Sequence, residues 1–516
     1  MPARPSDESP QAAPAELGRR VVTGARFVAL NRVVQMVATW VTTVALARFL
    51  DPSEYGLAGM ALVVFAILTV FQDSGLHAAL IQRRDRIQEA VDTATAYTPI
   101  LGVAVLLLCF ALAPLAGVFF HRHEVTDLVR ALGFVFLLRA FSQVPAAVLQ
   151  KELMFGRFAA VTISGTIVQS GIVIGLAAGG AGAWSVIIGQ LVLAGWQALL
   201  LWPLCPMRPH PRRASLTVLR ELLGYGRHMV GTNVSNFASA YVDVAVVGRM
   251  LGSAAVGAYT LGFQTGRQAV ASVTYVSNLV IFPAFSKLQD DLDRFRRAYL
   301  RSLRFVSVIS VPAGLGLAAV SQQFVDVVYG TRWSAAGPVV AIIALMGIVV
   351  SITAPMGEVL KAAGRPSLFF RLSLLQTALV AVGVIAVYRF GIAAVAGAQA
   401  GGVTVTGLVL GRSISRILDI DPREWVSTLL PSVVPGVVMG AGILVTKLAA
   451  SHYVDTARPG PLLLLIVEGA VIYLAIMRLT YRERYHEFIA ELARLVGVSK
   501  VRRLLPTPAK LFGNSS

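Results

Sequence analysis

The chain has 516 residues, of which 56% are hydrophobic and only 14% are charged, and its mean hydropathy is +0.70. A soluble domain carries about 25% charged residues, so this composition excludes a water-soluble globular protein. The net charge of +18 excludes nothing by itself, but the basic residues gather in loops between apolar runs, which argues against a nucleic-acid partner. Unbroken apolar runs of about 20 residues are too long for barrel strands and predict an all-α integral membrane protein.

The apolar runs predict about fourteen transmembrane helices. In chain order, their approximate centres are residues 35, 67, 105, 137, 170, 194, 238, 268, 312, 348, 379, 401, 438 and 470. We expect two pseudo-symmetric six-helix lobes plus two C-terminal helices. The predicted parts are a disordered cytoplasmic N-terminus at 1–20, an N-lobe with spans 1–6 at 21–205, a cytoplasmic linker at 206–227, a C-lobe with spans 7–12 at 228–412, spans 13–14 at 413–480, and a basic amphipathic cytoplasmic tail at 481–516.

A short turn occurs twice, once in each predicted lobe. The segment Arg48–Gly56 returns 201 residues later as Arg249–Gly257, with Arg, Leu and Gly at the same places. Both copies lie between the first two apolar runs of their half. A fixed internal shift indicates a duplicated architecture, and the halves of duplicated membrane proteins usually meet at a central site.

The loops alternate between basic and nearly uncharged. The basic set comprises Arg83–Arg86, Lys151–Arg157, Arg208–Arg227, Lys287–Arg304, Lys361–Arg371 and Arg412–Arg423. Since Lys and Arg concentrate in cytoplasmic loops, both termini are predicted to be cytoplasmic. The same basic segments predict attraction to anionic membrane lipids.

Two local patterns predict further details. Gly171 and Gly175 form a GxxxG pattern, which is expected to let two helices approach closely. The stretch Phe285–Phe305 is amphipathic and basic, and we expect it to lie along the membrane surface.

Polar residues inside the first spans are the candidate functional groups. Span 1 carries Arg26, Arg32 and Gln35, and the last two share a helix face. Span 2 carries Asp73 and His77, one turn apart if the helix is continuous, and span 4 carries Arg139. An arginine at the bilayer centre costs about 2.5–3.5 kcal/mol. These side chains are therefore expected to face a cavity or a partner, although each could instead make an interhelical hydrogen bond or salt bridge.

The second half has a similar distribution. The polar residues of its spans are Asn233, Asn236 and Asp243 in span 7, Gln264, Arg267 and Gln268 in span 8, and Glu358 at the end of span 10. Spans 12 to 14 are almost bare of polar groups. This distribution predicts a polar cavity between the two lobes.

These features resemble one known family. The first turn reads Ala47-Arg48-Phe49-Leu50-Asp51-Pro52-Ser53-Glu54-Tyr55-Gly56, followed by Asp73-Ser74-Gly75-Leu76 and Ala79-Leu80-Ile81-Gln82, and its echo runs from Asp243 to Tyr259. With the fourteen predicted spans, the chain is similar to the oligosaccharide repeat-unit flippases of the polysaccharide transporter family. Their superfamily also contains multidrug exporters and the lipid II flippase.

The resemblance implies a substrate and a mechanism. The substrate would be an oligosaccharide linked through pyrophosphate to a polyprenyl lipid, turned from the cytoplasmic to the outer leaflet by alternating access, for export as capsule, O-antigen or exopolysaccharide. It implies a bacterial inner-membrane protein that is not an enzyme and needs no cofactor, with a polysaccharide polymerase and export machinery as candidate partners. Arginines in spans 1 and 8 carry the family's sites, which makes Arg26, Arg32 and Arg267 the candidates here.

The chemistry of the side chains agrees with that substrate. A guanidinium group offers a planar fork of donors that matches phosphate oxygens, and the amides Gln35, Asn233, Asn236, Gln264 and Gln268 suit sugar hydroxyls. For Asp73, His77, Asp243 and Glu358, two roles stay open: pairing with the arginines of an empty site, or carrying a coupling H⁺ or Na⁺.

Three alternatives belong to other classes. A cation-coupled multidrug exporter would be expected to line its cavity with acids, whereas arginines are at least as prominent here. A lipid II flippase would share the fold. A membrane-bound polymerase or ligase would need a large outer loop with catalytic groups, and the longest predicted outer loop, Gln322–Gly337, has only Asp326 and Arg332 as charges. No metal site is predicted.

Overall fold

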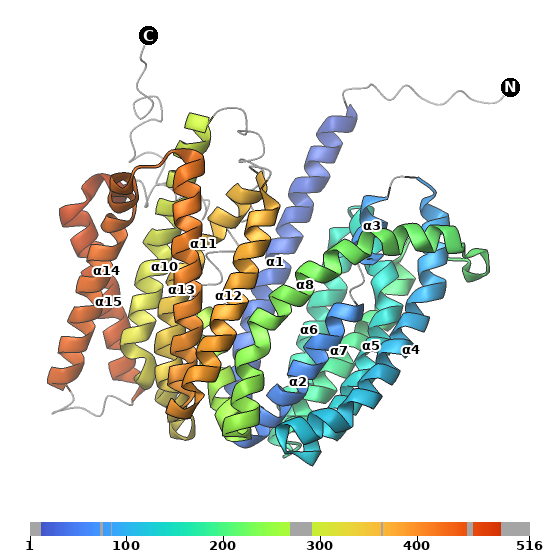
Figure 1. Cartoon of the computed structure of the whole chain (residues 1–516), viewed down its shortest axis with the longest axis horizontal. Coiled ribbons are helices and arrows are strands. Elements are labelled where there is room, and N and C mark those ends of the chain that lie inside the picture. Colours follow the sequence, from blue (N-terminus) through green and yellow to red (C-terminus); the bar gives the residue numbers. More distant parts are fainter. Residues whose placement is uncertain are drawn as a thin grey trace, which may run out of the picture. The chain divides into compact units, whose positions relative to one another are not determined.

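The computed structural model describes residues 12–72, 76–83, 85–268, 292–362, 365–450 and 458–486; within them, the side chains of 12–26, 71, 211, 225–240, 361–362, 366 and 450 are not described. The described chain is helical, with no strand, as Figure 1 shows. It divides into two compact units, residues 1–260 and 261–516.

The helices follow one another with short connections. In the first unit they are α1 (Ala12–Phe49), α2 (Pro52–Gln72), α3 (Leu76–Gln82), α4 (Ile87–Phe120), α5 (His123–Lys151), α6 (Phe155–Ala178), α7 (Ala183–Leu204), η1 (Pro211–Arg213) and α8 (Leu216–Leu251). A further helix is described over 253–268. The second unit continues with α10 (Leu292–Val328), η2 (Thr331–Ala336), α11 (Gly337–Ala362), α12 (Pro366–Val387), η3 (Tyr388–Phe390), α13 (Ile392–Leu418), α14 (Pro422–Ala450) and α15 (Pro459–Thr480).

Twelve segments in the described part of the chain are long and apolar enough to cross a membrane. Each of them coincides with a span predicted from the sequence, which confirms an all-helical, multi-pass membrane protein. The two other predicted spans, centred on 238 and 268, fall on α8 and on the helix 253–268, where part of the chain is not described. The total of fourteen therefore stays a prediction.

Helix bounds differ from the predicted segments in two places. The helix α1 begins at Ala12, so the described residues 12–20 are helical where the sequence predicted disorder. The helix α8 begins at Leu216, inside the predicted linker 206–227. In both cases a long helix extends beyond its apolar part, because good helix formers such as Ala, Leu and Arg continue the backbone hydrogen bonding past the membrane-spanning stretch.

The helix α5 is the centre of the first unit and packs against α2, α3, α4 and α7. Leu128, Leu132 and Phe136 on it are fully buried. A Cβ atom added to Gly102 on α4 would lie 2.7 Å from the Cβ atom of Ala140, so small residues set the close approach of α4 to α5. The predicted GxxxG contact is wrong, because no described atom lies within 4 Å of a Cβ added to Gly171 or Gly175.

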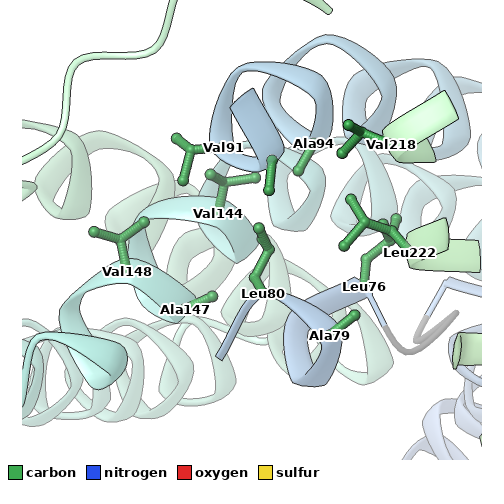
Figure 2. Packing of buried hydrophobic residues seen from close by; sticks show 11 residues of the cluster. Leu76, Ala79, Leu80, Val91, Ala94, Val144, Ala147, Val148, Val218 and Leu222 are labelled. Atoms are coloured by element: carbon green, nitrogen blue, oxygen red, sulfur yellow. The ribbon is translucent and has the colours of Figure 1, made fainter. Parts of the chain in front are cut away.

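An apolar cluster joins α3, α4, α5 and the start of α8. Figure 2 shows Leu80 of α3 beside Val144 and Ala147 of α5, and Leu222 of α8 beside Leu76. The Nζ atom of Lys151 donates to the carbonyl oxygens of Leu80, Ile81 and Arg83, which closes the C-terminal end of α3. The Nη2 atom of Arg83, just after α3, lies 2.8 Å from Oε2 of Glu221 on α8, and this ion pair connects the two helices.

The segment before α8 is fastened to α4 by a buried carboxylate. Asp92 is 2% exposed. Its Oδ1 atom accepts hydrogen bonds from the backbone N–H of His210 at 2.7 Å and from Nε2 of Gln88 at 2.9 Å. The hydroxyl of Thr93 accepts another from the backbone N–H of Ser215 at 3.1 Å. Part of the predicted linker is thus held on the first unit.

We expect Asp92→Ala to destabilise the first unit. The change leaves the N–H of His210 without its acceptor and costs about 1–3 kcal/mol. The apparent midpoint of thermal unfolding in detergent should fall by several degrees, and proteolytic cutting near residue 210 should accelerate. The control is Asp127→Ala, since that carboxylate is 67% exposed and makes one long ion pair of 3.4 Å with Arg130. Equal midpoints for the two variants would contradict the anchoring role.

In the second unit, α10 packs against α11, α14 and α15. Its first turns correct a prediction: Phe285–Phe305 was expected to lie on the membrane surface, but residues 292–305 are the beginning of α10. The apolar face of this stretch, with Phe295 and Tyr299, packs against Val359 of α11 and Ile414 of α13. Its amphipathic pattern therefore reflects helix packing. Residues 285–291 lie outside the described part.

Candidate functional site

Several predicted site residues cannot be placed by their side chains. Those of Arg26, Asn233 and Asn236 are not described, although all three lie on helices, in α1 and α8. Asp73 lies outside the described residues. His77 is half-buried on α3, a helix separate from α2. The predicted pairing of Asp73 and His77 across one helical turn thus stays untested.

On α1, Arg32 is exposed and Gln35 is half-buried. The neighbouring Asn31 has a different environment, because its Oδ1 atom accepts a hydrogen bond of 3.2 Å from the hydroxyl of Thr162 on α6. The amide of Asn31 thus helps to hold α1 against α6, while Arg32 and Gln35, three residues apart, follow one face of the helix.

The helix 253–268 has a packing face and a polar face. Cβ atoms added to Gly262 and Gly266 would lie 2.8 Å and 2.9 Å from the Cβ atoms of Val339 and Ile343 on α11, so the helix lies directly against α11 on that side. Between these glycines, the buried Thr265 is 2.8 Å from the hydroxyl of Tyr329.

The polar face of the same helix carries the three predicted residues. Gln264 and Arg267 are exposed and Gln268 is half-buried. Because the glycine side is occupied by α11, these side chains are directed away from it. An arginine turned out from a transmembrane helix is costly in lipid and favourable in a water-filled path.

Arg139 has a more structural environment than predicted. It is half-buried on α5, and its guanidinium carbon lies 5.4 Å from the ring centre of Phe65 on α2. Phe65 in turn stacks on Phe136 at 4.7 Å. A cation over an aromatic face is worth about 0.5–2 kcal/mol, so Arg139 contributes to the contact between α2 and α5. Its substrate-binding role remains a prediction.

Among the predicted acids that the structure describes, Asp243 on α8 is the most buried, with 1% exposure. Its Oδ2 atom accepts a hydrogen bond of 2.6 Å from the hydroxyl of Tyr259, which is fully buried, and its Oδ1 atom accepts one of 2.7 Å from the backbone N–H of Val244. Glu358 is half-buried on α11. Asp243 is thus a buried carboxylate held by two donors.

Tyr259 is a candidate that sequence reasoning missed. The turn between α8 and the next helix brings it back beside Asp243, sixteen residues earlier in the chain. The signal was available, since these two residues are the first and last of the echo that runs from Asp243 to Tyr259. Gln72, at the end of α2, is 2% exposed and its Nε2 atom donates to the carbonyl oxygen of Phe136 at 2.5 Å. It joins α2 to α5.

The predicted residues are divided between the two units. Arg32, Gln35, His77, Arg139 and Asp243 belong to the first, and Gln264, Arg267, Gln268 and Glu358 to the second. Among the described side chains, no group of three or more His, Cys, Asp or Glu is placed to hold a metal ion.

Comparison of the fold with solved structures defines the class of protein. A structure titled lipid II flippase MurJ, in an inward closed conformation, superposes with a TM-score of 0.71 at 13% identity, over 90% of this chain and 99% of that one. The chain therefore has the fold of this membrane flippase.

The sequence comparison shows the family. The model of the polysaccharide biosynthesis protein family matches residues 45–338, more than half of the chain, and the protein belongs to that family. It is 26% identical to the lipopolysaccharide biosynthesis protein WzxC of Escherichia coli (strain K12), over 78% of this chain and 80% of that relative. It is 24% identical to the teichuronic acid biosynthesis protein TuaB of Bacillus subtilis (strain 168), over 90% and 96%.

Proposed function

We propose that this protein is a flippase that moves a polyprenyl-pyrophosphate-linked oligosaccharide repeat unit from the cytoplasmic to the outer leaflet by alternating access. The observation that carries the proposal is the combination of a flippase fold over 90% of the chain with membership of a polysaccharide biosynthesis family. Relatives named for lipopolysaccharide and teichuronic acid biosynthesis support a polymer precursor as the cargo. Transport without chemical change of the cargo is the activity proposed, so the protein is not an enzyme.

The candidate substrate contacts follow from the chemistry of this cargo. Arg32 and Arg267, both exposed on membrane helices, are proposed to bind the pyrophosphate. Arg26 is a further candidate on α1. The amides Gln35, Asn233, Asn236, Gln264 and Gln268 are proposed to bind sugar hydroxyls while the lipid tail stays in the bilayer.

The proposed orientation places both termini in the cytoplasm of a bacterial cell, with the protein in the inner membrane. The alternation of basic and uncharged loops supports it. Anionic membrane lipids would then contact the basic loops, and a polysaccharide polymerase with export machinery would take up the product.

Energy is proposed to come from an H⁺ or Na⁺ gradient through Asp243. A buried ionisable group in a membrane helix marks an ion or proton path by default. The hydroxyl of Tyr259 holds one carboxylate oxygen, which fixes the orientation of the group. Asp73, His77 and Glu358 are secondary candidates.

The competing function is a cation-coupled multidrug exporter. The phenotype of a deletion strain distinguishes this function from the proposed one. A deletion strain should lose surface polysaccharide while its susceptibility to organic cations stays within about twofold of the parent. Restoring the gene should restore the polymer. A strain that keeps its polymer and becomes many-fold more sensitive to cationic drugs would reverse the proposal. The same deletion strain distinguishes the proposed function from that of a lipid II flippase. Loss of a lipid II flippase would make peptidoglycan precursors accumulate and reduce viability, while surface polymer would be unchanged.

A further inference from the structure

A cavity of about 590 Å³ lies in the first unit, where the ends of α3 and α5 meet the start of α4. Its wall combines two apolar side chains, two cationic ones and one amide, namely Ile81, Ile87, Arg83, Lys151 and Gln82. Ligand sites in proteins have this character, since a few polar groups in an apolar wall fix the orientation of what they bind. The proposed transport path uses none of these five residues, so the cavity needs a separate account.

Lys151 brings to this cavity a positive charge that its hydrogen bonds do not balance. Its ammonium group donates to the carbonyl oxygens of Leu80, at 3.1 Å, of Ile81, at 3.3 Å, and of Arg83. These three bonds use all the N–H groups of a lysine, but the carbonyl oxygens carry only partial negative charge. Among the described residues, no carboxylate forms an ion pair with Lys151. An anion in the cavity would therefore balance the charge without replacing the hydrogen bonds.

Arg83 and Gln82 supply hydrogen-bond donors on the same wall. The guanidinium group of Arg83 donates through Nε to the carbonyl oxygen of Asp85, at 3.0 Å, and through Nη2 to Glu221, at 2.8 Å. Neither bond uses Nη1, whose two N–H groups lie in the planar fork that matches phosphate oxygens. The side chain of Gln82 is exposed, and its amide nitrogen can donate as well.

We propose that this cavity binds the phosphate headgroup of a membrane lipid at the cytoplasmic surface. Nη1 of Arg83 donates to the phosphate oxygens, Lys151 balances the charge, and the apolar wall contacts the carbon chain next to the phosphate. The level of the cavity agrees with this ligand, since the ends of membrane helices lie among the headgroups and basic pockets on the cytoplasmic side bind anionic lipids. The inference rests on the proposed orientation of the protein and does not depend on transport.

Two lipids of the cytoplasmic leaflet would have such a headgroup, an anionic phospholipid and the polyprenyl-pyrophosphate carrier of the proposed substrate. The charges in the wall favour the first. Of its two cations, Arg83 is already paired with Glu221, while Lys151 has no carboxylate partner among the described residues. One uncompensated positive charge matches a phospholipid with a single negative charge, such as phosphatidylglycerol, whereas a pyrophosphate that is linked at both ends carries two.

A change of charge at position 82 tests the site. Because Gln82 is exposed, Gln82→Glu places an anion beside the proposed phosphate without changing the size of the side chain, and Gln82→Lys places a cation there. The matched control is Thr217→Glu, which adds an acid at an exposed position of α8 outside the wall of the cavity. The full-length proteins are purified in a neutral detergent and titrated with phosphatidylglycerol, and native mass spectrometry counts the lipids that stay bound.

Gln82→Glu should raise the phosphatidylglycerol concentration that half-fills the tightest site by about tenfold or more, and Gln82→Lys should lower it. Thr217→Glu should stay within about twofold of the wild type. Phosphatidylglycerol should also raise the midpoint of thermal unfolding more for the wild type than for Gln82→Glu. Equal half-filling concentrations in the wild type and both Gln82 variants would overturn the site. If Gln82→Glu does not fold, Gln82→Lys decides alone, and binding no tighter than that of the wild type would overturn it.

Two further probes identify the ligand. Phosphatidylcholine has the phosphate but no net charge and should bind about tenfold more weakly or less; binding equal to that of phosphatidylglycerol would overturn a site selected by charge. Polyprenyl pyrophosphate should displace phosphatidylglycerol only at a higher concentration, and displacement at a lower one would overturn the phospholipid as the occupant in favour of the substrate carrier. None of these titrations measures transport. A deletion strain with normal polymer would therefore leave the lipid site standing, and a failed titration would leave the flippase function standing.

Discussion

Replacing Arg32 and Arg267 together with glutamine is expected to abolish polymer export. Arg32 is exposed on the membrane helix α1, and Arg267 is exposed on the helix 253–268, which falls on a predicted span. Each is proposed to give charge-assisted hydrogen bonds to pyrophosphate oxygens. A hydrogen bond to a charged group is worth about 1.5–3 kcal/mol, which is about a ten- to hundredfold loss for each arginine. The single variants should therefore be impaired and the double variant should match the deletion strain.

The measurement is surface polymer per cell at matched protein levels. The control is Arg130→Gln, which also removes an exposed arginine but from the first turns of α5, where it pairs only weakly with Asp127. It should export normally. Normal export by the Arg32→Gln, Arg267→Gln double variant would exclude these arginines as the pyrophosphate contacts.

The second large effect is expected at Asp243. Asparagine has the same shape and still accepts the hydrogen bond from Tyr259, so Asp243→Asn should fold while it loses the ionisable group. If Asp243 carries the coupling ion, transport by this variant should no longer respond to a proton or sodium gradient. Transport of labelled substrate into vesicles with an imposed gradient measures this directly.

Tyr259→Phe supplies a graded version of the same test. It removes one of the two donors to a buried carboxylate, which costs about 1.5–3 kcal/mol, and should weaken coupling without abolishing it. Tyr329→Phe is the matched control, since that buried hydroxyl contacts Thr265 rather than a carboxylate. Full gradient dependence in Asp243→Asn would exclude Asp243 as the coupling site.

The class of fold was predictable because its signal is compositional. Apolar runs of the length of a bilayer determine where helices lie, and twelve described spans coincide with predicted ones. Helix packing was less predictable. The amphipathic pattern at the start of α10 could indicate a lipid surface or a neighbouring helix, and only the contacts of Tyr299 decide for the latter. Similarly, Gly171 and Gly175 had the right spacing but no close neighbour.

The sequence was enough to select the candidate site residues by type. It was not enough to predict what surrounds each of their side chains. A polar side chain in a membrane helix needs either a hydrogen-bond partner or water. Asn31 and Gln72 have a partner on a neighbouring helix, whereas Arg267 is proposed to face an open path. The sequence analysis did not select Tyr259, because a tyrosine within an apolar run is usually a packing residue. The repeated turn shows the opposite case. The repeat was evident in the sequence, but only the distances show that Gly56 lies against the backbone of Ser253 and Gly257 against that of Pro52.

The most direct test of the central claim is the transbilayer location of the lipid-linked oligosaccharide in a deletion strain. Lipids are extracted, identified by mass spectrometry, and assigned to a leaflet by their access to an impermeant reagent in intact cells and in inverted vesicles. The flippase account predicts a polyprenyl-pyrophosphate oligosaccharide that accumulates on the cytoplasmic side and returns to the outer leaflet when the gene is restored. Normal arrival of that lipid in the outer leaflet of the deletion strain would contradict it.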